Sequence, residues 1–287
     1  MSELVAMRQR IKAIETIKKV THAMRLISMS LHARLRTKKG NLDFYKNALV
    51  DMFTSIKQSH QTWHHHILEK KSSDTKPLII LIGSQKGLCG SFNNMLFSFI
   101  EHELELISYE NVHTILVGKK MVDNEQFHKG TISMTFPDFS QGKLLTIAQK
   151  ISDLIWHAHT PFTSVTIFYN YPKTFFLQKP HKVNLIPFDF QENQQQSGLK
   201  EEYYWEQKPE LILDFLAHKV VQCSIQDILF ESLIAEQAAR FVAMDNSTRN
   251  AKNLLQTMRL NYNKTRQAKI TREITDLVAS FQENLGS

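Results

Sequence analysis

The sequence has no glycine and no proline from Glu210 to Leu285, and none from Ser2 to Lys39. These two residues most disfavour a helix interior, so their absence removes the usual reasons for a helix to stop. A single helix over the longer stretch would reach roughly 114 Å at about 1.5 Å per residue. All seven prolines and eight of the nine glycines lie between the two stretches. The sequence therefore predicts two long terminal helices around a compact middle.

Other absences limit the class of protein. Cys89 and Cys223 are the two cysteines, so there is no disulfide framework and a reducing compartment is the default. The sequence contains no apolar run of about 18 residues, so it predicts no transmembrane helix. Arg8, Arg10 and Lys12 interrupt the apolar segment that a signal peptide would need. We expect a soluble intracellular protein, and its 287 residues could form one large or two modest domains.

Apolar residues recur at helical spacing in both terminal stretches. The N-terminal stripe can continue past Gly40 as far as Ile56. A one-sided stripe predicts that each helix packs one face on a partner, most simply as an antiparallel coiled coil of the two ends. Two separate amphipathic helices lying on one globular core are the alternative. The C-terminal stripe includes Leu229, Leu233, Val242, Leu254, Met258, Ile270, Ile274 and Leu277.

The net charge of +7 is concentrated at the two ends. Residues 1–40 carry ten Lys or Arg against Glu3 and Glu15, and residues 249–272 carry seven and no acid. If the ends pair antiparallel, these segments form one strongly basic tip. An acidic partner surface is one explanation for such a tip. Nucleic acid is a second possible partner, and a merely solvated face is a third interpretation.

The middle of the chain alternates strand and helix patterns, which predicts an α/β layer with a mainly parallel sheet. A hairpin is expected between Phe175–Leu177 and Val183–Phe188. The predicted domains are a coiled-coil helix at 1–60, a Rossmann-like α/β domain at 76–208 and a second coiled-coil helix at 209–287. Strands are expected at 77–82, 114–117, 131–136 and 165–169, and helices at 91–107, 119–127 and 143–157.

The loop Gly83–Gly90 follows an expected strand and precedes an expected helix, where backbone N–H groups can bind an anion. Lys86 could hold that anion, so a small-ligand α/β enzyme using this loop is one hypothesis. However, the loop lacks both the Gly-Lys-Ser/Thr of a nucleotide hydrolase and the spacing of a dinucleotide fingerprint. A tight strand-to-helix turn is favoured. Cys89 lies at the expected helix N-terminus, which would lower its pKa, but no base is near it in sequence.

The run His64-His65-His66 could bind a metal through imidazole, with His60 one turn earlier. No carboxylate or cysteine stands at ligand spacing beside it, so a polar helix end or loop is favoured. We find no acid pair, catalytic triad or metal-ligand spacing elsewhere. The sequence predicts a non-catalytic chain with no metal and no cofactor.

Three stretches stand out in order along the whole chain: Ile11–Met24; Gly87-Leu-Cys-Gly90 followed by Phe92-Asn93-Asn94; and Glu236–Met244 continued by Asn261–Ala268 and Ile270–Asp276. Together they resemble the gamma subunit family of F-type ATP synthases. Two departures indicate a divergent copy: Gln85-Lys86 stands where the family usually has an acid before the basic residue, and Ser280-Phe281 stands where the family has Gly-Ala.

The resemblance implies a central rotor stalk that couples ion flow, of H⁺ or Na⁺, to ATP synthesis or hydrolysis. The coiled coil would stand inside a ring of three alpha and three beta subunits and, as it turned, would force the catalytic sites into different states. The α/β domain would contact the c-ring and the epsilon subunit. The chain would be a peripheral protein at the cytoplasmic face of a bacterial inner membrane, associated with the membrane only indirectly.

The resemblance also implies contact residues. Arg266 and Gln267 match an Arg-Gln pair that contacts an acidic loop of the beta subunit, and Thr271 lies one turn further on. The other expected contacts are Arg25 and Arg240 on the shaft, and Tyr203 and Glu206 toward the c-ring. A basic coiled-coil protein that binds nucleic acid is the alternative, and it would require steeply salt-dependent binding.

Overall fold

The computed structural model describes residues 2–59, 63, 65, 76–105, 112–128, 130–158, 162–187 and 207–285. The chain divides into two compact units. One unit is Met29–Arg240, and the other pairs Met1–Ser28 with Phe241–Ser287.

Two long helices, α1 at Ser2–Ser59 and α5 at Pro209–Leu285, span 58 and 77 residues. Pro209 stands at the first position of α5, where its missing N–H removes no helical hydrogen bond. Helix α1 runs through Gly40, as the apolar stripe predicted. Long helices at both ends around a mixed sheet confirm the predicted α/β fold class.

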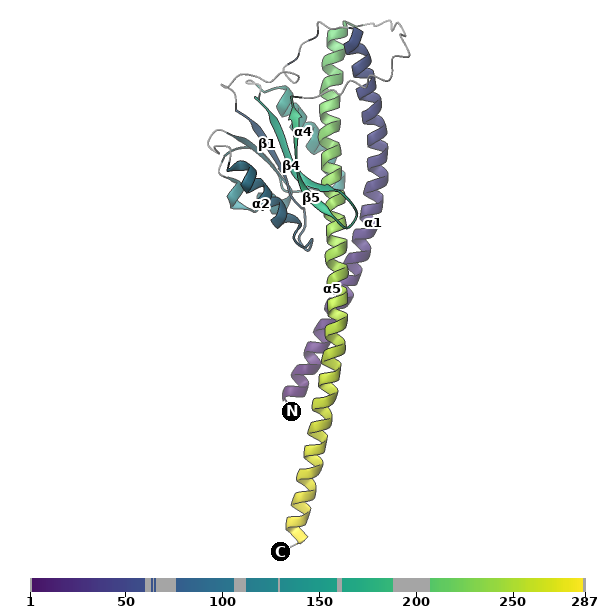
Figure 1. Cartoon of the computed structure of the whole chain (residues 1–287), viewed down its shortest axis with the longest axis vertical. Helices are drawn as coiled ribbons and strands as arrows, with labels where there is room; N and C mark the ends of the chain where they lie inside the picture. The colour runs from purple at the N-terminus through teal and green to yellow at the C-terminus, as the bar shows by residue number, and fades with distance from the viewer. Residues whose placement is uncertain are drawn as a thin grey trace. The chain divides into compact units, whose positions relative to one another are not determined.

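The unit Met29–Arg240 contains a five-stranded sheet with the strand order β3-β2-β1-β4-β5 (Figure 1). The first four strands are parallel, and β5 is antiparallel to β4. The strands are β1 (Leu78–Ile82), β2 (His113–Val117), β3 (Thr131–Phe136), β4 (Val165–Pro172) and β5 (Gln178–Ile186). The helices between them are α2 (Phe92–Leu104), α3 (Lys119–Val122) and α4 (Leu144–Trp156), with 3₁₀ turns η2 (Glu125–His128) and η3 (Gln141–Lys143).

Both faces of this sheet are covered, which is why its central strand is an unbroken apolar run rather than an alternating one. Ile80 of β1 belongs to a core shared with α4 and with the parts of α1 and α5 in this unit. Its neighbour Ile79 points to the other face, into a core with α2 and Met121. Figure 1 shows α2 on one side of the sheet and α4 on the other.

The predicted hairpin between Phe175–Leu177 and Val183–Phe188 was wrong. Strand β5 pairs with β4, from Val165 opposite Ile186 to Pro172 opposite Gln178. Phe175–Leu177 forms the turn between these strands, where Thr174 and Leu177 exchange backbone hydrogen bonds of 3.0 and 3.3 Å. Aromatic residues favour strands where they can cover a sheet face, but Phe176 is exposed and has no such face to cover.

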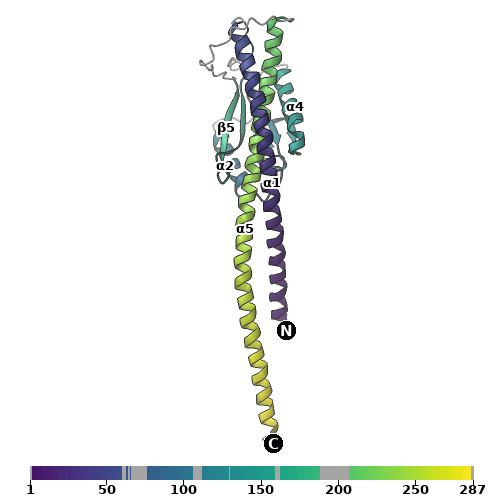
Figure 2. The same ribbon diagram turned by 90° about the vertical axis from the view of Figure 1, so that its right-hand side faces the viewer.

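In the second unit, the N-terminal segment and the C-terminal part of α5 pair antiparallel (Figure 2). Arg25 contacts Asp245 at 2.6 Å, Thr248 donates a hydrogen bond to Thr21 at 2.9 Å, and Arg259 pairs with Glu15. From Arg25 to Thr21 to Glu15 the residue number on α1 falls, while the number of the partner on α5 rises from 245 to 248 to 259. The two segments therefore run antiparallel. Figure 2 shows α5 continuing past the N-terminal end of α1. In this part of α5, Ile270, Ile274 and Leu277 of the predicted stripe are exposed.

A histidine between α4 and α5 gives the first unit a pH-dependent stability. His218 lies 3.2 Å from Asp153, 3.0 Å from the Ser152 hydroxyl and against the Trp156 ring. Burial lowers the pKa of His218, and Lys219 and His157 act in the same direction, against the raising effect of Asp153. The folded chain therefore binds this proton less readily than the unfolded chain does.

We expect the free energy of unfolding to fall as the pH drops through the ordinary histidine pKa of about 6.5. Above that range His218 is neutral in both states and contributes no penalty. His218→Gln should make the decrease between pH 7.5 and pH 5.5 smaller, as measured by urea denaturation followed by circular dichroism. An unchanged decrease in the variant would show that His218 is not responsible.

Candidate functional site

The predicted beta-subunit contacts lie together on the exposed C-terminal part of α5. Arg266, Gln267 and Thr271 all have exposed side chains. Gln267 and Thr271 are four residues apart and so share a helix face. The Thr271 hydroxyl donates a hydrogen bond to the backbone carbonyl of Gln267 at 3.0 Å. This hydrogen bond engages the Thr271 hydroxyl, while the side chains of Arg266 and Gln267 are exposed.

This part of α5 combines basic and apolar surface. Around Arg266 stand the exposed apolar side chains of Ile270, Ile274 and Leu277. Exposure of several apolar side chains to water is unfavourable, and their grouping with basic side chains fits a partner surface that offers acidic and apolar contacts.

A basic groove lies between the paired segments of the same unit. It has a volume of about 520 Å³. Four Lys or Arg and one Glu line it, so its field is positive. One of those cations, Arg259, pairs with the single acid, Glu15. The lining residues are Glu15, Lys18, Lys19, His22, Lys252, Leu255, Gln256 and Arg259.

The two other predicted shaft contacts have different surroundings. Arg25 binds Asp245 at 2.6 Å and lies 3.2 Å from the His22 ring nitrogen, so it helps to hold the paired segments of its unit. Hydrogen bonding to Arg25 lowers the pKa of Asp245. Arg240 is buried, with 5% of its side-chain surface exposed. It therefore has little surface to offer a partner and acts within the unit Met29–Arg240.

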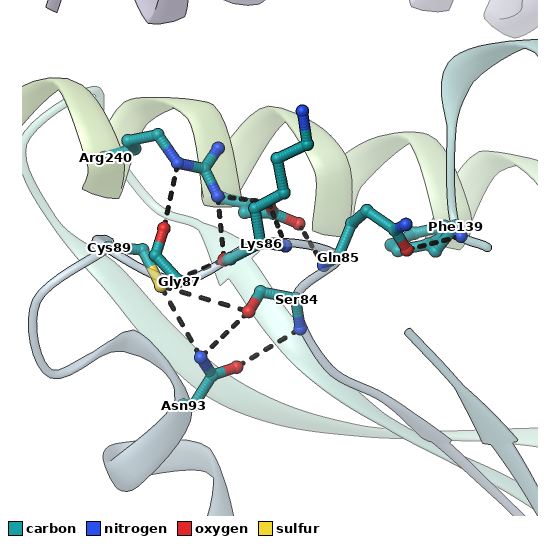
Figure 3. Close-up of polar contacts among 9 residues, drawn as sticks. Ser84, Gln85, Lys86, Gly87, Cys89, Asn93, Phe139 and Arg240 are labelled. Atoms are coloured by element: carbon teal, nitrogen blue, oxygen red, sulfur yellow. Dashed lines mark hydrogen bonds and ion pairs between the residues drawn. The ribbon is translucent and has the colours of Figure 1, made fainter. Parts of the chain in front are cut away.

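The glycine loop between β1 and α2 binds an anion that the chain itself supplies (Figure 3). The backbone N–H groups of Gln85 and Lys86 donate to the two carboxylate oxygens of Glu236, at 2.9 and 3.4 Å. Glu236 stands on α5 and has 2% of its side-chain surface exposed. The N–H groups that would face a phosphate are thus already bound to a carboxylate.

Arg240 completes this attachment from one turn further along α5. Its Nε donates to the Gly87 carbonyl at 3.2 Å, and its Nη2 donates to the Lys86 carbonyl at 2.9 Å. The same Nη2 contacts Glu236, so the two buried charges neutralise each other. We call this set, Glu236, Arg240 and the backbone of 85–87, the loop latch. Figure 3 shows Lys86 extending away from the latch.

The other side of the loop is held by α2. Asn93 donates to the Ser84 hydroxyl at 2.8 Å and accepts from the Ser84 N–H at 3.2 Å. Cys89 is buried beside them. The expected lowering of the Cys89 pKa was wrong: burial raises it, and the Glu236 carboxylate raises it further. The thiol is therefore a packed neutral group rather than a reactive one.

The histidine run and the expected c-ring contacts fall largely outside the described residues. Tyr203 and Glu206 lie outside them, as do His64 and His66. His65 stacks between Trp63 and Trp156, with ring centroids 5.7 and 4.4 Å apart. Within the described part of the chain, no group of three or more His, Cys, Asp or Glu is placed to hold a metal ion. Nor does any helix in that part meet the length and hydropathy that a membrane span requires.

Comparison with known proteins gives matches over nearly the whole chain. A family model described as ATP synthase matches residues 3–282. The ATP synthase gamma chain of Chlorobium chlorochromatii is 29% identical over 289 residues, covering 98% of this chain and 99% of that protein. That of Rickettsia prowazekii is 27% identical over 292 residues, with coverage of 98% and 99%.

The fold also matches that of one chain in a solved structure, the Euglena gracilis mitochondrial ATP synthase OSCP/F1/c-ring in rotational state 3. A chain of that assembly is 19% identical, with a TM-score of 0.67 and coverage of 98% of this chain and 94% of that one. At this level of identity the likeness concerns the fold.

Proposed function

The chain belongs to the ATP synthase gamma-chain family, and from that membership we propose that it is the central rotor stalk of an F1Fo ATP synthase. Its partners are the alpha and beta subunits, the epsilon subunit and the c-ring. The chain itself is non-catalytic. The observation that carries the proposal is the basic and apolar surface around Arg266 at the exposed end of α5.

The mechanism follows from symmetry and differential contact. A single asymmetric shaft within a ring of three alpha and three beta subunits meets each catalytic site with a different face. The shaft can shift the conformation of a catalytic site only if its contacts with that site differ in free energy between the site's alternative conformations. The exposed cations and apolar side chains near Arg266 supply such direction-dependent contacts. Rotation of the shaft then changes nucleotide affinity at each site in turn.

Within this function, Arg266 and Gln267 contact an acidic loop of the beta subunit, and Thr271 supports them. Arg25 adds a shaft contact on α1, and the buried Arg240 adds one indirectly by holding the glycine loop. Tyr203 and Glu206 face the polar loops of the c-ring. The three-part division into 1–60, 76–208 and 209–287 separates the shaft helices from the α/β domain.

The chain works at the cytoplasmic face of a bacterial inner membrane, as a peripheral protein held there by its partners. Two other functions lose their basis. The nucleic-acid alternative rested on the basic ends, and the family membership gives those ends another partner. The small-ligand enzyme needed free N–H groups in the glycine loop, and Glu236 occupies those of Gln85 and Lys86.

Co-expression with the alpha and beta subunits tests the proposal. Deletion of residues 260–287 is expected to abolish ATP-driven ion pumping, measured in membrane vesicles by a pH-sensitive or ion-sensitive dye. Arg266→Ala should lower pumping per ATP hydrolysed by about tenfold, since a charge-assisted hydrogen bond contributes about 1.5 kcal/mol and about 1.4 kcal/mol is a factor of ten. The circular dichroism of the isolated chain should not change.

Arg272→Ala is the matched control. Arg272 is also an exposed arginine on α5, and six positions place it about 240° around the helix from Arg266. We expect it to affect pumping much less. Normal coupling after the deletion, or no gamma-dependent alpha-beta hexamer, would reject the proposed function.

A further inference from the structure

The basic groove between the paired segments of α1 and α5 has cations on both walls. Lys18 and Lys19 stand on α1. Lys252 and Arg259 stand on α5, and the buried Leu255 is the apolar part of the lining. Cations that converge from two helices surround an anion more completely than a one-sided patch does. The volume of about 520 Å³ is within the usual range for a small-ligand site.

Three of the four cations have no counter-charge among the residues that the structure describes. Arg259 pairs with Glu15. No described carboxylate forms an ion pair with the others, Lys18, Lys19 and Lys252. Lys18 is also half-buried, so its stem is held against the wall of the groove. Because like charges held close together repel one another, this arrangement is unfavourable until an anion enters.

His22 adds a hydrogen-bond donor to the lining. An Arg25 guanidinium nitrogen lies 3.2 Å from the His22 Nδ1. A guanidinium only donates, so Nδ1 is the acceptor and the ring proton is on Nε2. His22 lines the groove from α1, and Gln256 lines it from α5 with a side-chain amide. The groove thus offers neutral donors as well as charges to the oxygens of an anion.

The groove is elongated along the two helices. Its lining runs from Glu15 to His22 on α1 and from Lys252 to Arg259 on α5. Each run advances seven positions, which corresponds to about 10 Å of helix. On α5 one cation stands at each end of this run. A single phosphate group meets only part of such a groove, whereas two or three linked phosphates can follow its length.

We propose that this groove binds a phosphate chain, the diphosphate or triphosphate group of a small anion, as a counter-ion that bridges α1 and α5. Lys18, Lys19 and Lys252 contact its oxygens. Because the anion meets both walls only when the two segments are paired, its binding stabilises the pair by mass action. The proposal goes beyond the proposed function and does not depend on it, since every contact lies within one unit of this chain.

Isothermal titration calorimetry of the full chain tests the site, with sodium pyrophosphate as the probe at low ionic strength. We expect one saturable site per chain and a higher urea midpoint at saturating pyrophosphate. Lys18→Gln combined with Lys252→Gln should weaken binding at least about tenfold, because one lost charge-assisted hydrogen bond already corresponds to about that factor. The circular dichroism of this variant should equal that of the wild type.

Lys12→Gln combined with Lys264→Gln is the matched control. Lys12 and Lys264 are exposed lysines on the same two segments, and neither lines the groove. The control removes the same charge and should keep the pyrophosphate affinity within about twofold, since remote exposed charges are screened. Equal weakening by the two double variants would overturn the proposal, because binding would then follow net charge alone. Absence of saturable binding to the wild-type chain would also overturn it.

Further probes identify the source of the phosphate chain. ATP that binds as tightly as pyrophosphate would assign a nucleotide as the ligand, and a preference for pyrophosphate would assign the free diphosphate. Inorganic phosphate or sulfate that binds equally tightly would refute an extended anion. A single-stranded oligonucleotide that binds more tightly than pyrophosphate would assign the groove to nucleic acid and overturn the proposal. The ion-pumping experiments are independent of these titrations, so failure of this site leaves the proposed function standing.

Discussion

Replacing Arg240 by methionine is expected to lower the free energy of unfolding by about 3–5 kcal/mol, because the substitution leaves the Glu236 carboxylate buried without a counter-charge. The Glu236 carboxylate would keep its hydrogen bonds from the N–H groups of Gln85 and Lys86. These hydrogen bonds lower, but do not remove, the free-energy cost of a buried charge without a counter-charge. The carbonyls of Lys86 and Gly87 would also lose their donors. Urea denaturation of the full chain, followed by circular dichroism, measures the change.

A double-mutant cycle shows whether the cost belongs to the pair. Glu236→Gln alone strands the Arg240 guanidinium, so it should also destabilise strongly. Glu236→Gln with Arg240→Met removes both charges and should cost less than the sum of the two single substitutions. Additive costs would show that the two residues act independently.

An exposed pair with the same spacing is the control. Arg249 and Asp245 are also four residues apart on α5 and lie 2.7 Å apart, but 75% of the Arg249 side chain is exposed. Arg249→Met should cost no more than about 0.5 kcal/mol, as is usual for a solvent-screened helix pair. If Arg240→Met cost equally little, burial would not be the source of the latch's stability.

The long helices and the sheet core were predictable because their signals are local. The absence of glycine and proline from Glu210 to Leu285 predicted the limits of α5 almost to the residue. The apolar run before Gly83 predicted β1. Gly40 did not end α1, because a single glycine in a helix costs only about 1 kcal/mol and tertiary packing outweighs it. Strand β3 was found at its observed limits, Thr131–Phe136.

The features that sequence reasoning missed are all long-range. Nothing near Gly83–Gly90 indicated that its anion would be Glu236, about 150 residues away in sequence. The one available signal was the spacing of Glu236 and Arg240, which places an acid and a base on one helix face, a pattern that more often marks a solvated pair. The Cys89 pKa was mispredicted for the same reason, since position at a helix N-terminus is local and burial is not.

The candidate contact residues were predictable only in part. The resemblance to the gamma family selected Arg266 and Gln267, and helical spacing added Thr271 one turn further on; the structure gives all three exposed side chains. What each of them touches depends on subunits that this chain does not encode, so their roles stay predictions.

Gly118→Ala should destabilise the chain by about 2–5 kcal/mol, the sum of backbone strain and overpacking. Gly118 has φ +93° and ψ 139°, a conformation that is essentially restricted to glycine. A Cβ atom there would lie 2.4 Å from the Gly83 carbonyl oxygen and 2.9 Å from its carbon. Neither backbone can retreat easily, because Gly83 N–H donates to Val117 and Gly118 N–H donates to Phe136, both at 2.9 Å.

Gly40→Ala makes the same chemical change with the opposite expected sign. A Cβ at Gly40 meets nothing within 4 Å, and the position is inside helix α1. Alanine there should raise the free energy of unfolding by about 0.5–1 kcal/mol, because the unfolded chain loses conformational freedom. Denaturation midpoints of both variants, measured side by side, separate the two effects. Equal shifts would mean that the close approach of Gly118 to Gly83 does not control stability, and that the end of β1 can move to admit a methyl group.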